Sequence, residues 1–172
     1  FGLLSFVSYL VEGAVGDWSA LYLFEDKGIV IEEAVMGVML FNGTMCIGRL
    51  LGNRLGKHLT SKQVVVGGYL LGSIAMGLIV FLPGHASMYT YLLLGISLAM
   101  IVPNLFSAMG EQNVIPMTQA VATSTMLGYM GILMGPALIG FIAHGTSLTV
   151  AFIVLTTLLV VSAGIGKYAY HL

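Results

Sequence analysis

Long apolar runs, separated by short groups of polar and helix-breaking residues, divide this chain into six segments. Each approaches the roughly 20 apolar residues that a helix needs to cross a bilayer, and none shows the alternating polarity of a transmembrane β-strand. We predict helices at about 2–24, 33–53, 63–82, 88–110, 118–142 and 147–168. The breakers between them are Gly28, Ser61, Pro83-Gly84, Pro116 and Gly145-Thr146. The pattern predicts an all-α membrane protein, with residues 1–172 forming a single six-transmembrane-helix bundle.

Composition agrees with the pattern and excludes several other classes. Hydrophobic residues make up 58% of the chain and charged residues 8%, and the mean hydropathy is +1.01, well above the range of soluble proteins. A net charge of −1 gives no footprint for nucleic acid. The single cysteine, Cys46, excludes a disulfide within the chain. Because Phe1 already lies in an apolar run without a basic start, we expect a cut chain rather than a signal peptide.

The basic residues predict an orientation. With six spans, five of the six Lys and Arg residues fall on one side of the membrane: Arg49, Arg54, Lys57, Lys62 and Lys167. The exception, Lys27, lies among acidic residues of the 25–33 segment. Short cytoplasmic loops carry an excess of Lys and Arg. We therefore expect the 54–62 loop and both chain ends in the cytoplasm, and the 25–33 loop outside.

Polar residues form stripes on three of the predicted helices. An ionisable side chain in a membrane helix is costly unless it faces a partner or a water-filled cavity, so each stripe is a functional hypothesis. The first stripe holds Ser5, Ser8, Glu12, Gly16 and Ser19, with Tyr9 at its edge. The second holds Asn42, Cys46, Arg49 and Asn53, and the third Ser97, Met100, Asn104, Ser107 and Glu111. We expect these faces to meet, around a cavity or in a closed polar network.

The stripes supply the candidate site residues. Glu12 is our candidate for a proton-coupling group, with a neutral, hydrogen-bonded acid as the alternative; Asp17, on a different face, is a second candidate that can equally be structural. The candidates for solute binding are Tyr9, Trp18, Asn42, Asn104 and Tyr129.

Trp18 can also be an interfacial aromatic. We expect the same of five tyrosines, which are Tyr22, Tyr89, Tyr91, Tyr168 and Tyr170. We expect no metal site, because His85 and His144 fall in outward turns without a neighbouring acid, and we expect no cofactor.

Small residues and prolines mark two helices. In the segment 118–142, Ser124, Gly128, Gly131 and Gly135 share a face. Such a face lets two helix backbones approach closely, and Pro136 adds a kink by removing a backbone hydrogen bond. We expect Gly131, Gly135 and Pro136 to serve helix packing. Pro103 interrupts the 88–110 segment beside Asn104.

One segment resembles a known signature. Residues 48–58, GRLLGNRLGKH, resemble the G-x-x-x-D-R-x-G-x-[RK]-[RK] loop of the major facilitator superfamily at Gly48 or Gly52, Arg54, Gly56 and Lys57. The chain departs from the signature at Asn53, where the family has an acid, and at His58. Segments 12–23, 102–111 and 128–152, which read EGAVGDWSALYL, VPNLFSAMGE and GYMGILMGPALIGFIAHGTSLTVAF, look like the C-terminal half of YbjJ-like and MosC-like inner-membrane transporters, which are related to fucose permeases.

The resemblance implies one half of a facilitator fold in a bacterial inner membrane. The missing N-terminal six-helix half would come from the same protein, a second chain or a second copy. It also implies that the 48–57 segment is a conformational latch, with Asn53 in place of the acid that fixes the family's loop. We expect a symporter that moves a small polar solute with protons by alternating access.

Two other classes are weighed against transport. A non-transporting membrane receptor or assembly partner would use the same polar stripes as closed networks. An intramembrane enzyme is disfavoured, because the sequence holds no metal constellation, no Ser-His pair at membrane depth and no pair of acids on one helix face.

Overall fold

A computed structural model describes residues 1–55, 59–112 and 114–170, with the backbone alone for residues 53–55. Within them the chain forms helices and no strand. The helices are α1 (Gly2–Glu25), α2 (Ile31–Leu55), α3 (Ser61–Phe81), α4 (Gly84–Ala99), α5 (Ile101–Glu111), α6 (Met117–Gly145) and α7 (Leu148–Ala169). The prediction of an all-helical bundle is confirmed.

The fourth predicted span is two helices that meet at Met100. Pro103 lies in the first turn of α5, where its missing N–H leaves no helical hydrogen bond unmade. Asn104 donates to the carbonyl oxygen of Met100 both from its backbone nitrogen, at 3.2 Å, and from its side-chain Nδ2, at 2.8 Å. Sequence predicted an interruption here, and the structure places it just before the proline.

Five segments are long and apolar enough to cross a membrane. They are Ile31–Gly52, Ser61–Phe81, Gly84–Glu111, Met117–Gly145 and Leu148–Ala169. Helix α1 has 24 residues, about 36 Å of helix, but falls outside this set, and it carries Glu12 and Asp17. The expected membrane bundle is confirmed, whereas six spans are confirmed only in part.

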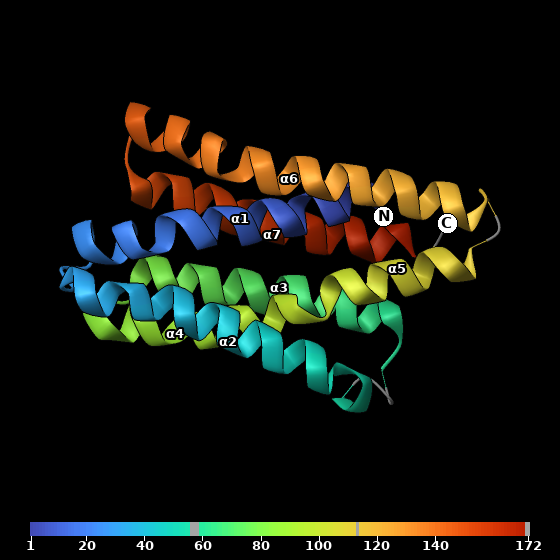
Figure 1. The fold of residues 1–172 in the computed structure, drawn as a ribbon, viewed down its shortest axis with the longest axis horizontal. Coiled ribbons are helices and arrows are strands. Elements are labelled where there is room, and N and C mark those ends of the chain that lie inside the picture. Colours follow the sequence, from blue (N-terminus) through green and yellow to red (C-terminus); the bar gives the residue numbers. More distant parts are fainter. Residues whose placement is uncertain (56–58, 113, 171–172) are drawn as a thin grey trace.

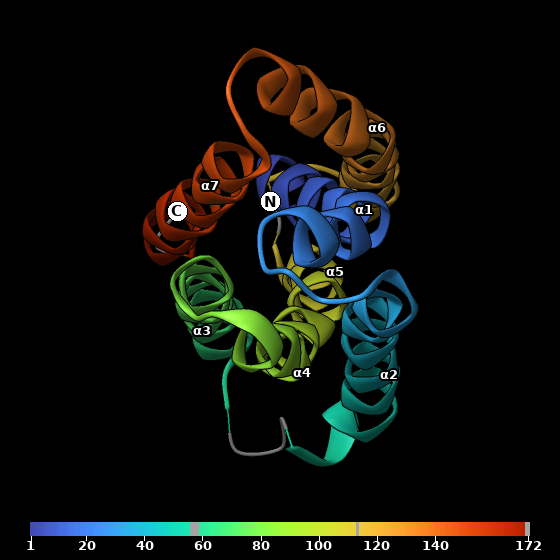
Figure 2. The same ribbon diagram turned by 90° about the vertical axis from the view of Figure 1, so that its left-hand side faces the viewer.

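The helices run along the long axis of the molecule (Figure 1). Seen from one end, α1, α6 and α7 lie on one side of the bundle, and α2, α3, α4 and α5 lie on the other (Figure 2). The most extensive contacts join α1 to α6, α2 to α4 and α3 to α7. Both termini and the connection from α2 to α3 lie toward the same end of the bundle (Figure 1). This arrangement agrees with the prediction that both chain ends and the connection between the second and third helices lie on the same side.

Large aromatic side chains fill the core, including two that we expected at the membrane interface. Tyr22 and Tyr91 have no exposed surface, and the Tyr22 ring stacks on Phe152 at 4.2 Å between centroids. The interfacial assignment of these two tyrosines is therefore wrong. Both were judged by their depth along the helix, and that depth does not say which way a side chain faces.

Charged groups at the end of the bundle near the connection from α1 to α2 link neighbouring helices. Lys27, in the loop after α1, donates from Nζ to the carbonyl oxygens of Val80 at 2.6 Å and Leu82 at 2.9 Å. Burial lowers the pKa of Lys27, and the nearby charge of Asp26 raises it. His85 Nε2 lies 2.8 Å from Glu33 Oε2. Our prediction that His85 lacks a neighbouring acid is wrong, because the acid comes from another helix.

Candidate functional site

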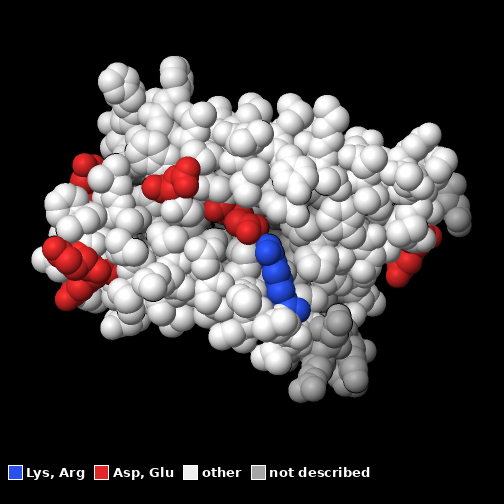
Figure 3. Space-filling view, viewed as in Figure 1, with Lys and Arg blue, Asp and Glu red and all other residues white. Residues whose placement is uncertain are grey.

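Glu12 of α1 and Arg49 of α2 form an ion pair that is partly exposed on the surface of the bundle. Arg49 Nη2 donates to both carboxylate oxygens of Glu12, at 3.2 Å to Oε2 and 3.4 Å to Oε1. Their side chains are 22% exposed for Glu12 and 43% for Arg49. The space-filling view shows a basic side chain meeting an acidic one midway along the molecule, on a mostly uncharged face (Figure 3).

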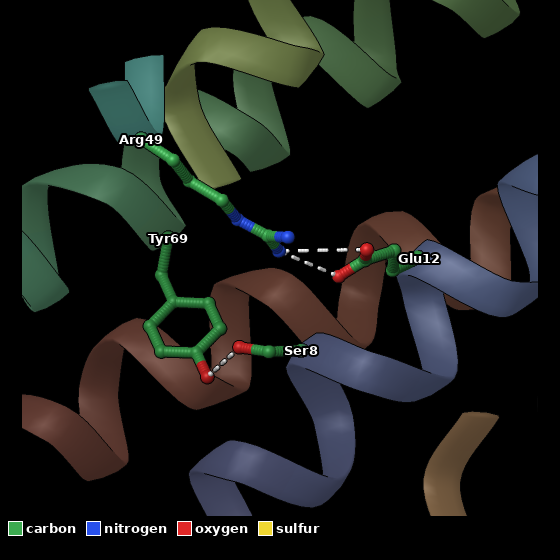
Figure 4. A network of polar contacts seen from close by, with 4 residues as sticks. All are labelled: Ser8, Glu12, Arg49 and Tyr69. Carbon is green, nitrogen blue, oxygen red and sulfur yellow. Dashed lines mark hydrogen bonds and ion pairs between the residues drawn. The ribbon is translucent and has the colours of Figure 1, made fainter. Parts of the chain in front are cut away.

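The sequence placed both residues on polar stripes but gave them separate roles. Arg49 was counted among the basic residues that predict orientation, because it lies near the end of its helix. In the structure its long side chain reaches from α2 to the middle of α1 (Figure 4). The first two predicted stripes therefore meet, and Arg49 is a site residue that the sequence analysis missed. Its available signal was a shared stripe with Asn42 and Cys46.

A buried hydrogen-bonded group lies beside the ion pair. Tyr69 of α3 has no exposed surface, and its hydroxyl donates to the carbonyl oxygen of Leu4 at 2.6 Å. Because that bond uses the single phenolic proton, the Ser8 hydroxyl donates to Tyr69 Oη across 2.7 Å. Ser8 lies one turn before Glu12 on the same face of α1 (Figure 4). These bonds hold α1 against α3 and fix the face that presents Glu12.

The other long contact of α1 is with the glycine-rich face of α6. Ser5 and Ser124 share a hydrogen bond of 2.7 Å between their hydroxyl oxygens. A methyl group built on Gly131 would overlap the carbonyl oxygen of Phe6, and one on Gly135 would overlap that of Leu10. The two glycines therefore let the backbones of α1 and α6 touch, which is the geometry that small residues permit in membrane helices.

Pro136 leaves one backbone carbonyl of α6 without its usual helical hydrogen bond at the contact with α1. A proline cannot donate to the carbonyl four residues earlier, so Ile132 lacks its usual helical donor. Gly13 of α1 approaches that carbonyl so closely that a Cβ there would lie 2.7 Å from the oxygen. The Trp18 indole donates to the carbonyl of Pro136 itself at 2.9 Å. Glycines and the proline thus place α1, with Glu12, at a fixed distance from α6.

The remaining candidates differ in how close they lie to the ion pair. Tyr9 lies close enough to Glu12, Arg49 and Tyr129 for electrostatic interaction, so the structure brings these four together. Asn104 lies apart: its amide is bonded within its own helix.

Asp17, Asn42 and Tyr129 are exposed, and within the described residues their side chains form no hydrogen bond or ion pair. They face away from the packed interior and are open to a partner. Cavities of about 350, 350, 470 and 280 Å³ lie elsewhere in the described bundle, and none of the four is lined by Glu12 or Arg49. The ion pair is on an open face rather than in an enclosed pocket of this chain.

The predicted latch segment is described only at its beginning. A Cβ on Gly48 would lie 2.6 Å from that of Ala99, and one on Gly52 would overlap the Met100 side chain. Both glycines let α2 approach the junction of α4 and α5. The side chains of Asn53 and Arg54, and all of Gly56 and Lys57, lie outside the described residues.

Comparisons with known proteins identify the chain's relatives. No family model matches it. It is 43% identical, over 88% of its length, to an uncharacterised MFS-type transporter of Yersinia pestis. It is 30% identical over 96% of its length to the membrane protein MosC of Rhizobium meliloti, and 28% identical over 89% to an uncharacterised transporter of Sinorhizobium fredii.

The matches cover 40%, 41% and 41% of these proteins. The chain therefore spans about two fifths of the length of its curated relatives. The apolar helices agree with an integral, multi-pass membrane protein. The predicted resemblance is confirmed: the chain is homologous, over most of its length, to proteins named as major facilitator (MFS-type) transporters and to the membrane protein MosC.

Proposed function

We propose that this chain forms one wall of the pathway of a secondary transporter that moves a small polar solute together with protons. The observation that carries the proposal is the Glu12–Arg49 pair, which joins the middle of α1 to α2 and is partly exposed. Two charged groups there need protein or water over them, because lipid contact is costly. A second six-helix bundle, the N-terminal half of the same protein or a second chain, would cover this face and enclose the pathway.

The pair also provides a way to couple a proton to conformational change. Protonation of Glu12 would remove the charge that Arg49 faces, so proton binding and the ion pair exclude each other. Release of Arg49 frees α1 from its polar link to α2 at this depth. Two helices that are linked in one protonation state and released in the other support the alternating access of facilitator folds.

Open side chains favour transport over a receptor or assembly partner. A non-transporting protein on this fold would close its polar stripes into satisfied networks. Within the described residues, Asp17, Asn42 and Tyr129 are exposed and have no hydrogen-bond partner in the chain. Side chains of this kind are suited to contact a solute, water or the second bundle in turn.

The test is uptake driven by a pH gradient in liposomes that hold the complete protein. Glu12→Gln keeps the shape of the side chain and removes its charge and its proton, so we expect the gradient to lose its effect on uptake. Glu32→Gln is the matched control, because Glu32 is exposed in the first turn of α2. Gradient-driven uptake that is unchanged in Glu12→Gln would show that the proton role is wrong.

A further inference from the structure

We infer that the transported solute carries an anionic group, such as a carboxylate, which binds the Arg49 guanidinium when protonated Glu12 releases it. The inference rests on the proposed function and adds the chemical class of the solute. Its basis is the way Arg49 is used in the ion pair.

Arg49 has unused binding capacity on the open face. A guanidinium carries five N–H donors in a planar fork, but both contacts with Glu12 use Nη2 (Figure 4). Within the described residues, the Nε and Nη1 donors have no partner. A guanidinium of this kind can bind a planar anion by two parallel hydrogen bonds, which is the arrangement in which arginine is most selective.

The existing pair is loose enough to be exchanged. Its distances of 3.2 and 3.4 Å exceed the roughly 2.7–2.9 Å of strong, charge-assisted bonds between nitrogen and oxygen. Both oxygens share one nitrogen, so the fork-to-fork arrangement is not formed. A solute carboxylate that engages two nitrogens would make better bonds to Arg49 than Glu12 does.

Charge balance then explains why the anion and the proton would travel together. The pair has no net charge. An anion alone would leave the site with one negative charge, and a proton alone would leave one positive charge, each costly in a poorly hydrated pathway. When both bind, the proton joins the Glu12 carboxylate, the anion replaces it at Arg49, and the site is neutral again. No bond other than the O–H bond on Glu12 forms, and no redox partner is needed.

The ionisable groups around the pair come from several helices. On α1 the exposed acid Asp17 lies one to two turns after Glu12, on a different face. Tyr9 on α1 and Tyr129 on α6 lie nearby, and α3 contributes Tyr69, whose hydroxyl is bonded to Ser8 and Leu4.

In the described parts of α5 and α7, the charged side chains are Glu111 and Lys167, at the helix ends, and α4 has none with a permanent charge. From α2, Asn42 and Cys46 share the exposed face of Arg49 and offer neutral contacts to the rest of the solute. The site has a single fixed positive group, which suits a solute with one negative group.

The test measures thermal stabilisation of the purified complete protein by small anions and their neutral analogues. The probes are lactate against lactamide, propionate against propionamide, and inorganic phosphate, each at mildly acidic and at neutral pH. We expect at least one anion, and not its amide, to raise the melting temperature, more strongly at the lower pH, because proton binding to Glu12 would release Arg49. In Arg49→Gln the apparent affinity should fall by about tenfold to hundredfold, as for the loss of charged hydrogen bonds.

A second variant separates a binding role from a structural one. In Glu12→Gln the arginine is free at every pH, so the same anion should bind equally well at both pH values and at least as tightly as in the unchanged protein at acidic pH. Arg49→Lys keeps the charge but loses the fork, and it should restore part of the affinity. Glu32→Gln should behave as the unchanged protein does.

The outcomes distinguish this inference from the proposed function. Stabilisation by amides alone, by no anion in the set, or by an anion equally in Arg49→Gln would overturn the anionic class. If gradient-driven uptake of a neutral solute is nevertheless lost in Glu12→Gln, the proposed proton-coupled transport stands without it. If uptake ignores the gradient while an anion binds through Arg49, the proton coupling fails and the anion site remains.

Discussion

The indole nitrogen of Trp18 in α1 donates a hydrogen bond of 2.9 Å to the carbonyl oxygen of Pro136 in α6. The same ring lies over Gly140, where a Cβ would be 2.8 Å from Trp18 Cζ2. The indole therefore joins α1 to α6. Its polar edge is used by the protein, so any solute that touches Trp18 meets the apolar remainder of the ring.

Replacing Trp18 with Phe should weaken this joint. The variant keeps an aromatic ring near Gly140 but removes the donor to Pro136. Hydrogen bonds between membrane helices contribute about 0.6–2 kcal/mol, so we expect a lower melting temperature of the purified complete protein. Tyr168→Phe is the control, since Tyr168 is 71% exposed. Equal melting of Trp18→Phe and the unchanged protein would show that the bond adds no stability.

Adding one methyl group at Gly135 should separate α1 from α6. In the structure that methyl overlaps the carbonyl of Leu10 and lies 3.3 Å from the backbone nitrogen of Ala14, and neither backbone atom can turn away. Overpacking typically costs about 1–3 kcal/mol, and we expect Gly135→Ala to lower both the melting temperature and the yield of folded protein.

Gly67→Ala in α3 is the matched control for this change. Nothing lies within 4 Å of a Cβ at Gly67, and alanine favours a helix over glycine by about 1 kcal/mol. This variant should be as stable as the unchanged protein or slightly more so. If both alanine variants melt alike, close contact at Gly135 does not limit stability.

Sequence patterns predicted the helices well because each helix is encoded locally. Apolar runs and breakers fall within a few residues of the observed helix ends, except that the fourth predicted segment is two helices that meet at Met100. The row of small residues near Pro136 marked the tight face of α6. The partner of that face was not predictable, because the pairing of α1 with α6 joins segments more than 100 residues apart. A local pattern shows which residues share a face of a helix, but it does not show which other helix packs against that face.

The same limit explains what the sequence missed at the site. Glu12 was recognisable as an acid near the middle of an apolar helix. Its partner Arg49 was assigned to the membrane surface from the position of its Cα near the helix end. A long arginine side chain can carry its charge several ångströms away from that position, which the sequence does not reveal. Nothing in the sequence distinguishes Tyr69 from the other tyrosines, of which the chain has eight in all, because both of its hydrogen bonds are to residues of another helix.

Removal of the Tyr69 hydroxyl should loosen the support of the Glu12 face. Tyr69→Phe keeps the ring but takes a donor from the Leu4 carbonyl and an acceptor from Ser8. A buried polar group left without its partner costs about 1–3 kcal/mol. We expect a lower melting temperature, together with weaker proton-driven uptake because Glu12 is less well fixed. If Tyr69→Phe changes neither measurement, α3 does not position α1 through this group.

Cysteine labelling in intact cells should report the predicted orientation. Val30 and Leu59 are 56% and 53% exposed, and they lie in the connections at opposite ends of α2. In a Cys46→Ser background, which removes the exposed native thiol, a membrane-impermeant maleimide should label Val30→Cys in intact cells and Leu59→Cys only after permeabilisation. This follows from the basic residues near 54–62, because Lys and Arg keep short loops in the cytoplasm. The reverse pattern would contradict the orientation, whereas labelling of both positions in intact cells would indicate a mixed insertion, which the strong charge asymmetry opposes.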